Sequence, residues 1–508
     1  MISMKRYTRT QSSLASGLTP AINVCKQLPM TLLALAVLNG CSLAPTAMTP
    51  KADVPKTYDA KTRVALQRSS EQTSSVASTA LQWQQLSDDP LLLQLLQEVR
   101  QQHRSLQQAR ITLAQLATSV DSASAARLPV LGLAADQSRQ RVTADLSATG
   151  SGEVQQRLNA QVGISAFELD LFGRAANAEQ AAQAQFYAEA ATLRASDLTI
   201  STAFVSQYLT LQWHQQQQQL AARTVLNLQE RLALIAARAE AGVDNELVLA
   251  QAKRELAATQ LSLAQAEVLV AQDVHALEQM LRRALTDAEI GRMQQALSQL
   301  KPVSAGLPAD LMLQRPDVMA AEQRLRATEA NIGIARAAYF PSIQLTATAG
   351  SASTELSNLF QGGSGSWSFS PRLDLPLWDF GARASQVERA ELARDLAVSQ
   401  YQAIVEQAFR EVADSLSSLE YGTLQLTAAK EQHQQAMQVL QLTQQREAAG
   451  LDSALVRLDA QRSWYSAASL QLAQEFQLQL ARLTLFKAVG GEQELSADNV
   501  AKAPTVTQ

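Results

Sequence analysis

Two helical stretches of equal length constrain this chain more than any other feature. Each begins at a Phe-Gly pair, Phe172-Gly173 or Phe380-Gly381, and continues to a corner, Ala241-Gly242-Val243-Asp244 or Ala449-Gly450-Leu451-Asp452. The two glycines that bound each stretch are 69 positions apart in both cases. At ~1.5 Å of rise per residue, such a helix reaches roughly 100 Å. No globular core is that wide, so each helix must lie in an elongated bundle or coiled coil, or span a compartment.

The two stretches belong to two copies of one unit. Upstream of them, Arg127-Leu128-Pro129 matches Tyr339-Phe340-Pro341, which offsets the copies by about 210 residues. We expect repeat 1 over 86–300 and repeat 2 over 301–490, each with a helix, a β-hairpin, a long helix and a return helix, before a C-terminal tail at 491–508. The predicted ranges are, in repeat 1, a hairpin at about 128–172 and helices at 173–242 and 244–285, and in repeat 2, a hairpin at 341–378 and helices at 316–339, 381–450 and 452–488.

Composition excludes several classes of function. The net charge of −4 is too small to favour nucleic acid as a partner. The sequence contains no HExxH, GxSxG or phosphate-binding Gly-rich motif, so we expect no catalytic residues, no metal site and no cofactor. Four histidines are scattered in polar helical sequence without ligand spacing, and we interpret them as solvated surface residues: His103, His214, His275 and His433.

The N-terminus is typical of an exported lipoprotein. Basic residues precede a short apolar run at 28–38, which is too short for a membrane span and predicts a signal peptide over 1–40. The run ends in Leu38-Asn39-Gly40-Cys41, which resembles a bacterial lipobox, so Cys41 is predicted to carry a covalent lipid. The alternative is an ordinary signal peptide with an incidental cysteine. Residues 41–85 are rich in small and polar residues and predict a lipidated tether.

Four segments alternate between apolar and polar residues, as expected for strands of a membrane barrel, although the segment near 129–145 alternates only weakly. Residues 158–166 alternate strictly, and the phase flips after Ala166, as at a bulge or where a chain leaves a sheet. The alternative is a small amphipathic sheet on a soluble core, but four such strands in an exported chain favour the barrel. Four strands cannot close a barrel, and an open edge in hydrocarbon costs several kcal/mol for each unpaired group. Strands that span a membrane would therefore require an oligomer.

Helix packing and helix ends can also be predicted. Apolar residues recur every seven positions on the first return helix, which indicates side-by-side packing as a coiled coil: Leu249, Leu256, Leu263, Val270 and Leu277. At the corners, Gly should end one helix, and Asp244 or Asp452, or the residue after it, should cap the next. Ser87 or Asp88 is expected to cap the first helix, which should continue to about Ala126.

Several motifs resemble the TolC-like outer-membrane efflux channels, in particular their lipoprotein branch, the outer components of RND-type tripartite pumps. They are FELDLFGR at 167–174, QRPDV at 314–318, IGIARAAYFP at 332–341 and LDAQR at 458–462, together with the lipobox at Cys41. The resemblance implies an α+β membrane protein in which a homotrimeric 12-strand transmembrane β-barrel, four strands per chain, continues into a long periplasmic α-helical coiled-coil tube. It also implies two partners, a periplasmic adaptor (membrane fusion) protein and an inner-membrane RND-type transporter.

The same resemblance implies the site residues. Leu455 would form an apolar constriction and Asp459 an acidic ring at the periplasmic gate, although Asp459 could instead pair with Arg462 or Arg457 on the helix surface. The first repeat has Gln251 at the position that matches Asp459. The adaptor-docking tip would consist of the two corners: Gly242, Val243, Asp244, Gly450, Leu451 and Asp452.

Two functions follow from these features. The favoured one is a passive, non-enzymatic export duct for small molecules, lipid-anchored in the outer membrane of a Gram-negative bacterium, with a large periplasmic part. The alternative is a lipid-anchored periplasmic coiled-coil protein of structural or adaptor type. The amphipathic hairpins distinguish the two functions, because a periplasmic spacer needs no barrel strands.

Overall fold

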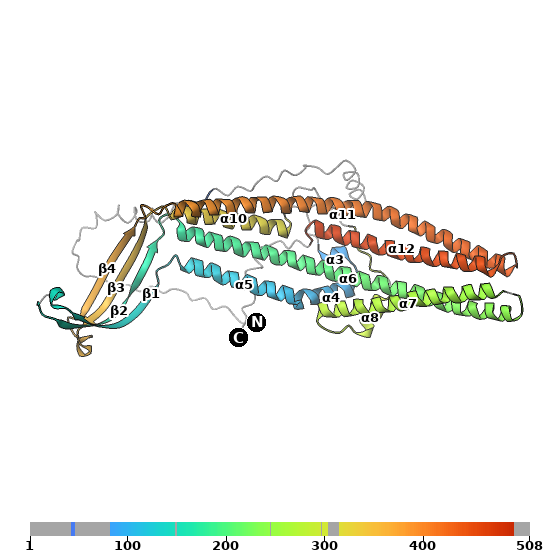
Figure 1. Cartoon of the computed structure of the whole chain (residues 1–508), viewed down its shortest axis with the longest axis horizontal. Helices are drawn as coiled ribbons and strands as arrows, with labels where there is room; N and C mark the ends of the chain where they lie inside the picture. Colours follow the sequence, from blue (N-terminus) through green and yellow to red (C-terminus); the bar gives the residue numbers. More distant parts are fainter. Residues whose placement is uncertain are drawn as a thin grey trace, which may run out of the picture.

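The computed structural model describes residues 42–45, 82–147, 150–243, 245–295, 297–302 and 314–491. The molecule is long, with a four-stranded sheet at one end and paired helices that run to the other (Figure 1). Cys41 and Asp244 lie outside the described residues. The elements are α3 Trp83–Leu86, α4 Pro90–Gln102, α5 Arg104–Ala125, β1 Leu131–Val142, η1 Ala144–Leu146, β2 Glu153–Leu169, α6 Arg174–Glu240, α7 Glu246–Leu281, α8 Asp287–Met293, α10 Pro316–Ala337, β3 Ser342–Ser353, η2 Leu356–Asn358, β4 Gly365–Asp374, α11 Ala382–Ala448 and α12 Ala454–Ala488.

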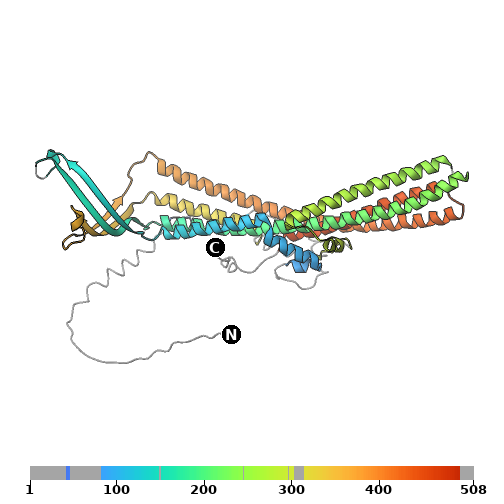
Figure 2. The same ribbon diagram turned by 90° about the horizontal axis from the view of Figure 1, so that it is seen from below.

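The two long helices, α6 and α11, are equal in length at 67 residues each. Gly173 and Gly381 precede them with φ of 74° and 93°, a left-handed conformation that glycine adopts without the penalty of a Cβ. Each helix then turns sharply into its partner, α7 or α12, at the far end from the sheet (Figure 2). The repeat of sequence is therefore a repeat of structure.

The strands form one antiparallel sheet in the order β1-β2-β3-β4. The two hairpins are joined by the β2–β3 pairing, which aligns Ile164 with Ala347 and Phe167 with Leu345. Ser165 and Ala166 of β2 thus lie opposite a single residue of β3, Thr346, which makes a β-bulge. The phase flip after Ala166 is therefore confirmed as a bulge within the sheet.

The main hydrophobic core lies in the middle of the molecule, where segments from both repeats meet. Trp83 of α3 contacts Phe486 of α12 with ring centroids 4.7 Å apart, and Trp213 of α6 stacks on Phe476 at the same distance. Buried Gln212 of α6 binds the segment after α8, because its side-chain oxygen accepts from Ser298 N–H at 2.9 Å. This core fixes repeat 1 against repeat 2.

Three expectations about the first helix and the histidines were wrong. The first helix is not continuous: α4 ends at Gln102, His103 has extended backbone (ψ 129°), and α5 begins at Arg104, with the His103 ring accepting from Ser105 N–H. Asp89, rather than Ser87 or Asp88, caps α4. The reason is that Pro90 takes the first helical position, so the residue directly before it becomes the cap.

The third wrong expectation concerns His214, which is not a solvated surface residue. Its Nδ1 lies 2.5 Å from Asp273 Oδ2, and both side chains are only 12 % exposed. His433 also has a partner, Gln471, at 2.7 Å.

None of the helices in the described residues is both long and apolar enough to cross a membrane.

Candidate functional site

The sheet has one apolar face and one polar face across all four strands. Leu133, Val162, Ala349 and Trp367 are aligned partners on successive strands and form one apolar row. The adjacent row, whose side chains point to the opposite face, consists of small and polar residues: Gly132, Gly163, Thr348 and Ser368. A sheet divided in this way can separate hydrocarbon from water.

The bulge in β2 preserves this division towards the helices. Without the extra residue, Phe167 and Leu169 would point to the polar face, because a shift of one residue exchanges the two faces of a strand. With it, they align with Leu345 and Ile343 on the apolar side. Ala166 adopts φ of 51° at the bulge, and its N–H donates to Thr346 Oγ1 at 3.1 Å.

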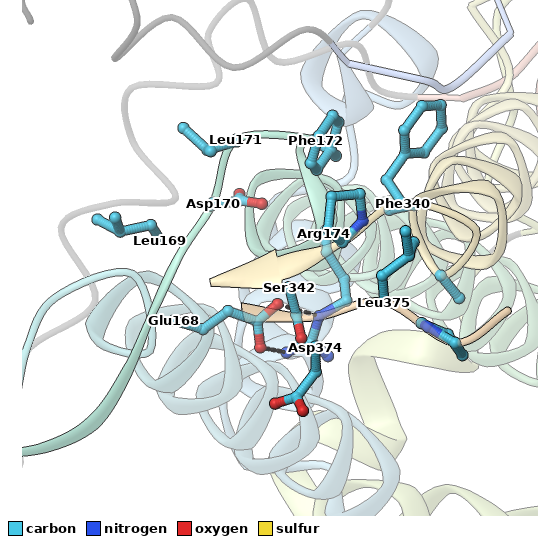
Figure 3. A pocket seen from close by; sticks show the side chains of 14 residues that line it. Glu168, Leu169, Asp170, Leu171, Phe172, Arg174, Phe340, Ser342, Asp374 and Leu375 are labelled. Atoms are coloured by element: carbon cyan, nitrogen blue, oxygen red, sulfur yellow. Dashed lines mark hydrogen bonds and ion pairs between the residues drawn. The ribbon is translucent and has the colours of Figure 1, made fainter. Parts of the chain in front are cut away.

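A cavity of about 480 Å³ lies where the sheet meets the helices, and Figure 3 shows its lining. Phe172 stacks on Phe340 with ring centroids 4.6 Å apart, which joins the end of the first hairpin to the start of the second. Arg174 forms an ion pair with Glu168, and Asp374 lies close by (Figure 3). The charges of this junction are largely paired, which suits a wall more than a binding pocket.

The two corners at the far end are matched helix stops. Gly242 and Gly450 have φ of 73° and 72°. The N–H of the residue after each glycine donates to the backbone carbonyl of Arg238 or Arg446, as in a Schellman motif. Val243 and Leu451 are exposed at the apex. Asn245 caps α7, as predicted for that position, whereas Ser453 makes no side-chain cap bond. The corners therefore present two apolar side chains on a rigid turn.

The expectation that Asp452, or Ser453 after it, caps α12 was wrong, because Asp452 instead pairs with Arg446 of α11 at 2.7 Å and Ser453 makes no cap bond. The hydrogen bond from Arg446 holds the pKa of Asp452 below its ordinary value. The carboxylate therefore stays ionised at the tip, and its bond to Arg446 holds the corner against the end of α11.

The predicted gate residues share one exposed helix face. Leu455 and Asp459 are one turn apart on α12, and Leu455 is 42 % exposed. Asp459 accepts from Arg462 at 2.5 Å, which is one of the two pairings that the alternative interpretation allowed. Both side chains of that pair remain more than half exposed, so the contact does not remove Asp459 from solvent.

Arg457 is not available to Asp459, because it belongs to a buried cluster. Glu447 of α11 accepts from Arg457 at 3.1 Å and also from Arg231 of α6. The side chains of Arg231 and Glu447 are only 6 % and 11 % exposed. This cluster ties the long helix of repeat 1 to the corner of repeat 2, and no sequence motif marks it.

Within the described residues, no group of three or more His, Cys, Asp or Glu side chains could hold a metal ion. The structure instead has a two-faced sheet, a long helical wall and a narrow helical tip.

Comparison with known proteins agrees with this geometry. The chain matches the family described as "Outer membrane efflux protein" over residues 95–282 and 307–491. The chain belongs to this family. The prediction of an outer-membrane efflux channel without enzymatic activity is thereby confirmed, and the alternative of a periplasmic structural or adaptor protein is removed.

Individual outer membrane efflux proteins are similar over nearly their whole length. The toluene efflux pump outer membrane protein TtgI of Pseudomonas putida is 36% identical, over 92% of this chain and 98% of its own. The antibiotic efflux pump outer membrane protein ArpC of the same species is 33% identical, over 91% and 95%. The crystal structure of the open state of the Neisseria gonorrhoeae MtrE outer membrane channel has a TM-score of 0.78 at 28% identity, over 89% and 98%. The predicted fold, four antiparallel strands with long helices, is confirmed.

Proposed function

We propose that three copies of this chain form one continuous export duct, with twelve strands in the outer membrane and a helical tube in the periplasm. The observation that carries the proposal is the two-faced sheet with open edges. In the described chain, β1 and β4 each pair on one side only. Their free N–H and C=O groups would each cost several kcal/mol in hydrocarbon, so β4 of one copy pairs with β1 of the next. Three copies are the number that the family resemblance implies.

The tip is proposed to be both gate and docking surface. Leu455 and Asp459 from three chains would surround the axis, where an apolar ring and an acidic ring restrict flow and favour cations. The corners, with Val243 and Leu451 exposed, offer an apolar surface to a periplasmic adaptor, which in turn couples to an inner-membrane RND-type transporter. The chain supplies no energy, so opening follows from the adaptor's greater affinity for the open state.

The cargo and the anchor follow from the relatives and the N-terminus. Because related proteins serve toluene and antibiotic efflux pumps, we propose small organic compounds, including solvents and antibiotics, as the exported class. Cys41 is proposed to carry the lipid that anchors the chain to the outer membrane, since it follows a lipobox-like sequence.

Single-channel conductance in a planar bilayer tests the duct and its gate. The wild type should give small, cation-favouring steps, and Leu455→Ala/Asp459→Ala should give larger steps without cation preference. The matched control is Leu247→Ala/Gln251→Ala, at the equivalent positions of α7, which removes no charge and should keep the cation preference. Unchanged conductance in the first variant would place the gate elsewhere, and no steps from confirmed trimers would contradict the duct.

A further inference from the structure

Residues 42–45, just after the predicted lipidation site, pack against the helical tube at one defined place. Ser42 Oγ donates a hydrogen bond of 2.8 Å to Oδ1 of Asn177, in the first turn of α6. Asn177 is 0 % exposed. The contact spans 135 positions of sequence, so it is a tertiary contact and not a local turn.

Gly333 of α10 makes room for this contact. A Cβ at this position would lie 2.5 Å from Asn177 Nδ2 and 3.0 Å from the backbone nitrogen of Ala44. Glycine within a helix is unfavourable relative to alanine. At Gly333 the missing side chain instead allows α6, α10 and the N-terminal segment to meet at one point.

Asn177 is a polar residue on a buried helix face that otherwise carries alanines. The next inward residues of α6 are alanines that pack closely against neighbouring helices: Ala181, Ala184 and Ala188. Asn177 Nδ2 is a buried donor without a hydrogen-bond partner in the described structure. A buried, half-satisfied amide among alanines is unfavourable for packing alone. It fits a site that receives a polar segment, whose Ser42 hydroxyl already donates to the Asn177 oxygen.

We propose that Asn177 and Gly333 form a docking slot for the residues after the lipidated cysteine and so fix where the lipid enters the membrane. This inference rests on the proposed lipidation of Cys41. Consecutive Cα atoms are ~3.8 Å apart, so a lipid on the residue before Ser42 is tethered within one residue of the slot. Asn177 lies four residues after Gly173, about 6 Å along α6 from the end of the sheet connection. The slot therefore holds the acyl chains at the level of the periplasmic leaflet.

The sequence predicts the slot at only one of the two repeat interfaces. At the equivalent positions, counted from Gly381 and Pro129, the other repeat has Ser385 and Asp121. An aspartate there adds a charged side chain where Gly333 leaves space. The trimer would thus hold three lipids, each between α6 and α10 of one chain.

Thiol labelling tests the slot. A Leu43→Cys chain would be placed in lipid nanodiscs, and its reaction with a water-soluble maleimide measured, with far-UV circular dichroism and trimer mass as checks of folding. Both Gly333→Ala and Asn177→Ala should speed labelling about tenfold. The Cβ of the first would push against Asn177 and the backbone of Ala44 and so displace the segment, and the second would remove the acceptor of the Ser42 hydrogen bond. The matched control is Gly291→Ala, a helical glycine with nothing within 4 Å, which should leave the rate unchanged.

The outcomes separate the slot from the lipid anchor. Because alanine favours helix, faster labelling in Gly333→Ala cannot come from loss of α10. Asn177→Ala introduces no clash, so its labelling rate tests the slot even if Gly333→Ala does not assemble. Equal rates in folded parent, Asn177→Ala and control chains would overturn the slot. Labelling of Cys41 in the wild type, which needs a free thiol, would instead overturn the lipid anchor while the Leu43→Cys comparison still reports on docking.

Discussion

Glu447 accepts hydrogen bonds from two arginines that belong to different helices, Arg231 of α6 and Arg457 of α12. Burial and the charge of Arg457 lower the pKa of Arg231 from its ordinary value. The Glu447 carboxylate therefore holds two positively charged guanidinium groups close together in a mostly buried cluster. The cluster lies one turn before the corner at Gly450, where it joins repeat 1 to the part of repeat 2 that carries the proposed gate.

Replacing Glu447 by Gln should destabilise the tip. The change leaves two guanidinium groups facing each other without a counter-charge, and removing one partner of a buried ion pair costs about 3–5 kcal/mol. The midpoint of thermal unfolding, followed by circular dichroism, should fall clearly. The control is Lys430→Ala, which removes an exposed pair with Glu475 at 3.8 Å and should change stability by about 0–1 kcal/mol. Equal midpoints for the two variants would mean that the buried cluster does not hold the tip.

At the scale of single residues, sequence reasoning found positions that follow local rules and missed those that depend on distant partners. Gly242 and Gly450 end helices because only the local backbone matters there. Arg231 and Glu447 are 216 positions apart, so no spacing in the sequence could pair them. The slot at Asn177 left one signal, a lone Asn in an Ala-rich first turn, which becomes meaningful only once Gly333 is beside it.

At the scale of elements, the alternation of residues predicted the strands, and the phase flip after Ala166 predicted a bulge as one of two outcomes. The pairing of β2 with β3 could not be read from alternation, because any two amphipathic strands could pair in several registers. The break at His103 was also hidden, since helical periodicity continues on both sides of it. A break of this kind depends on how α4 packs in the central core.

Adjacent residues of β4 provide a test of the sheet's two faces. Phe369 lies in an apolar row with Ala347 and Ile164, whereas Ser368 lies in the polar row beside Thr348. Phe369→Lys should therefore cost about 2–4 kcal/mol at mid-depth of the bilayer and prevent membrane assembly. Ser368→Lys, one position away, should assemble normally. The amount of trimer recovered from outer membranes measures both, and equal recovery would mean that the apolar face does not meet lipid.

At the scale of the whole molecule, the interface between the repeats within one chain indicates what the interface between chains should be. Inside the chain, α10 of repeat 2 covers α6 of repeat 1, and Ala184 and Ala188 of α6 are buried. The equivalent residues of α11, counted from Gly381, are Leu392 and Leu396, which are 62% and 60% exposed. These leucines lack the cover that their counterparts have. By the symmetry of the repeats, α5 of a neighbouring copy should provide it.

The same symmetry predicts one contact between chains in detail. Within the chain, Phe172 stacks on Phe340 at the sheet–helix junction. The equivalent residues are Phe380 and Leu128, which are both exposed. A Leu128→Cys/Phe380→Cys chain should form covalent dimers and trimers with a short thiol cross-linker, because the two positions should meet across neighbouring copies.

The matched control for this cross-link is Phe172→Cys/Phe340→Cys, which should link within one chain and leave its mass on denaturing gels that of a monomer. Each single cysteine variant should give no ladder. If the control pair links and native mass confirms a trimer, but Leu128→Cys/Phe380→Cys gives no ladder, then neighbouring chains do not meet as the two repeats do. Cross-linked dimers and trimers would mean that the contact between the two repeats of one chain is repeated between neighbouring chains. Each α6 would then pack beside α10 of its own chain and each α11 beside α5 of the next, and these repeated contacts would close the duct.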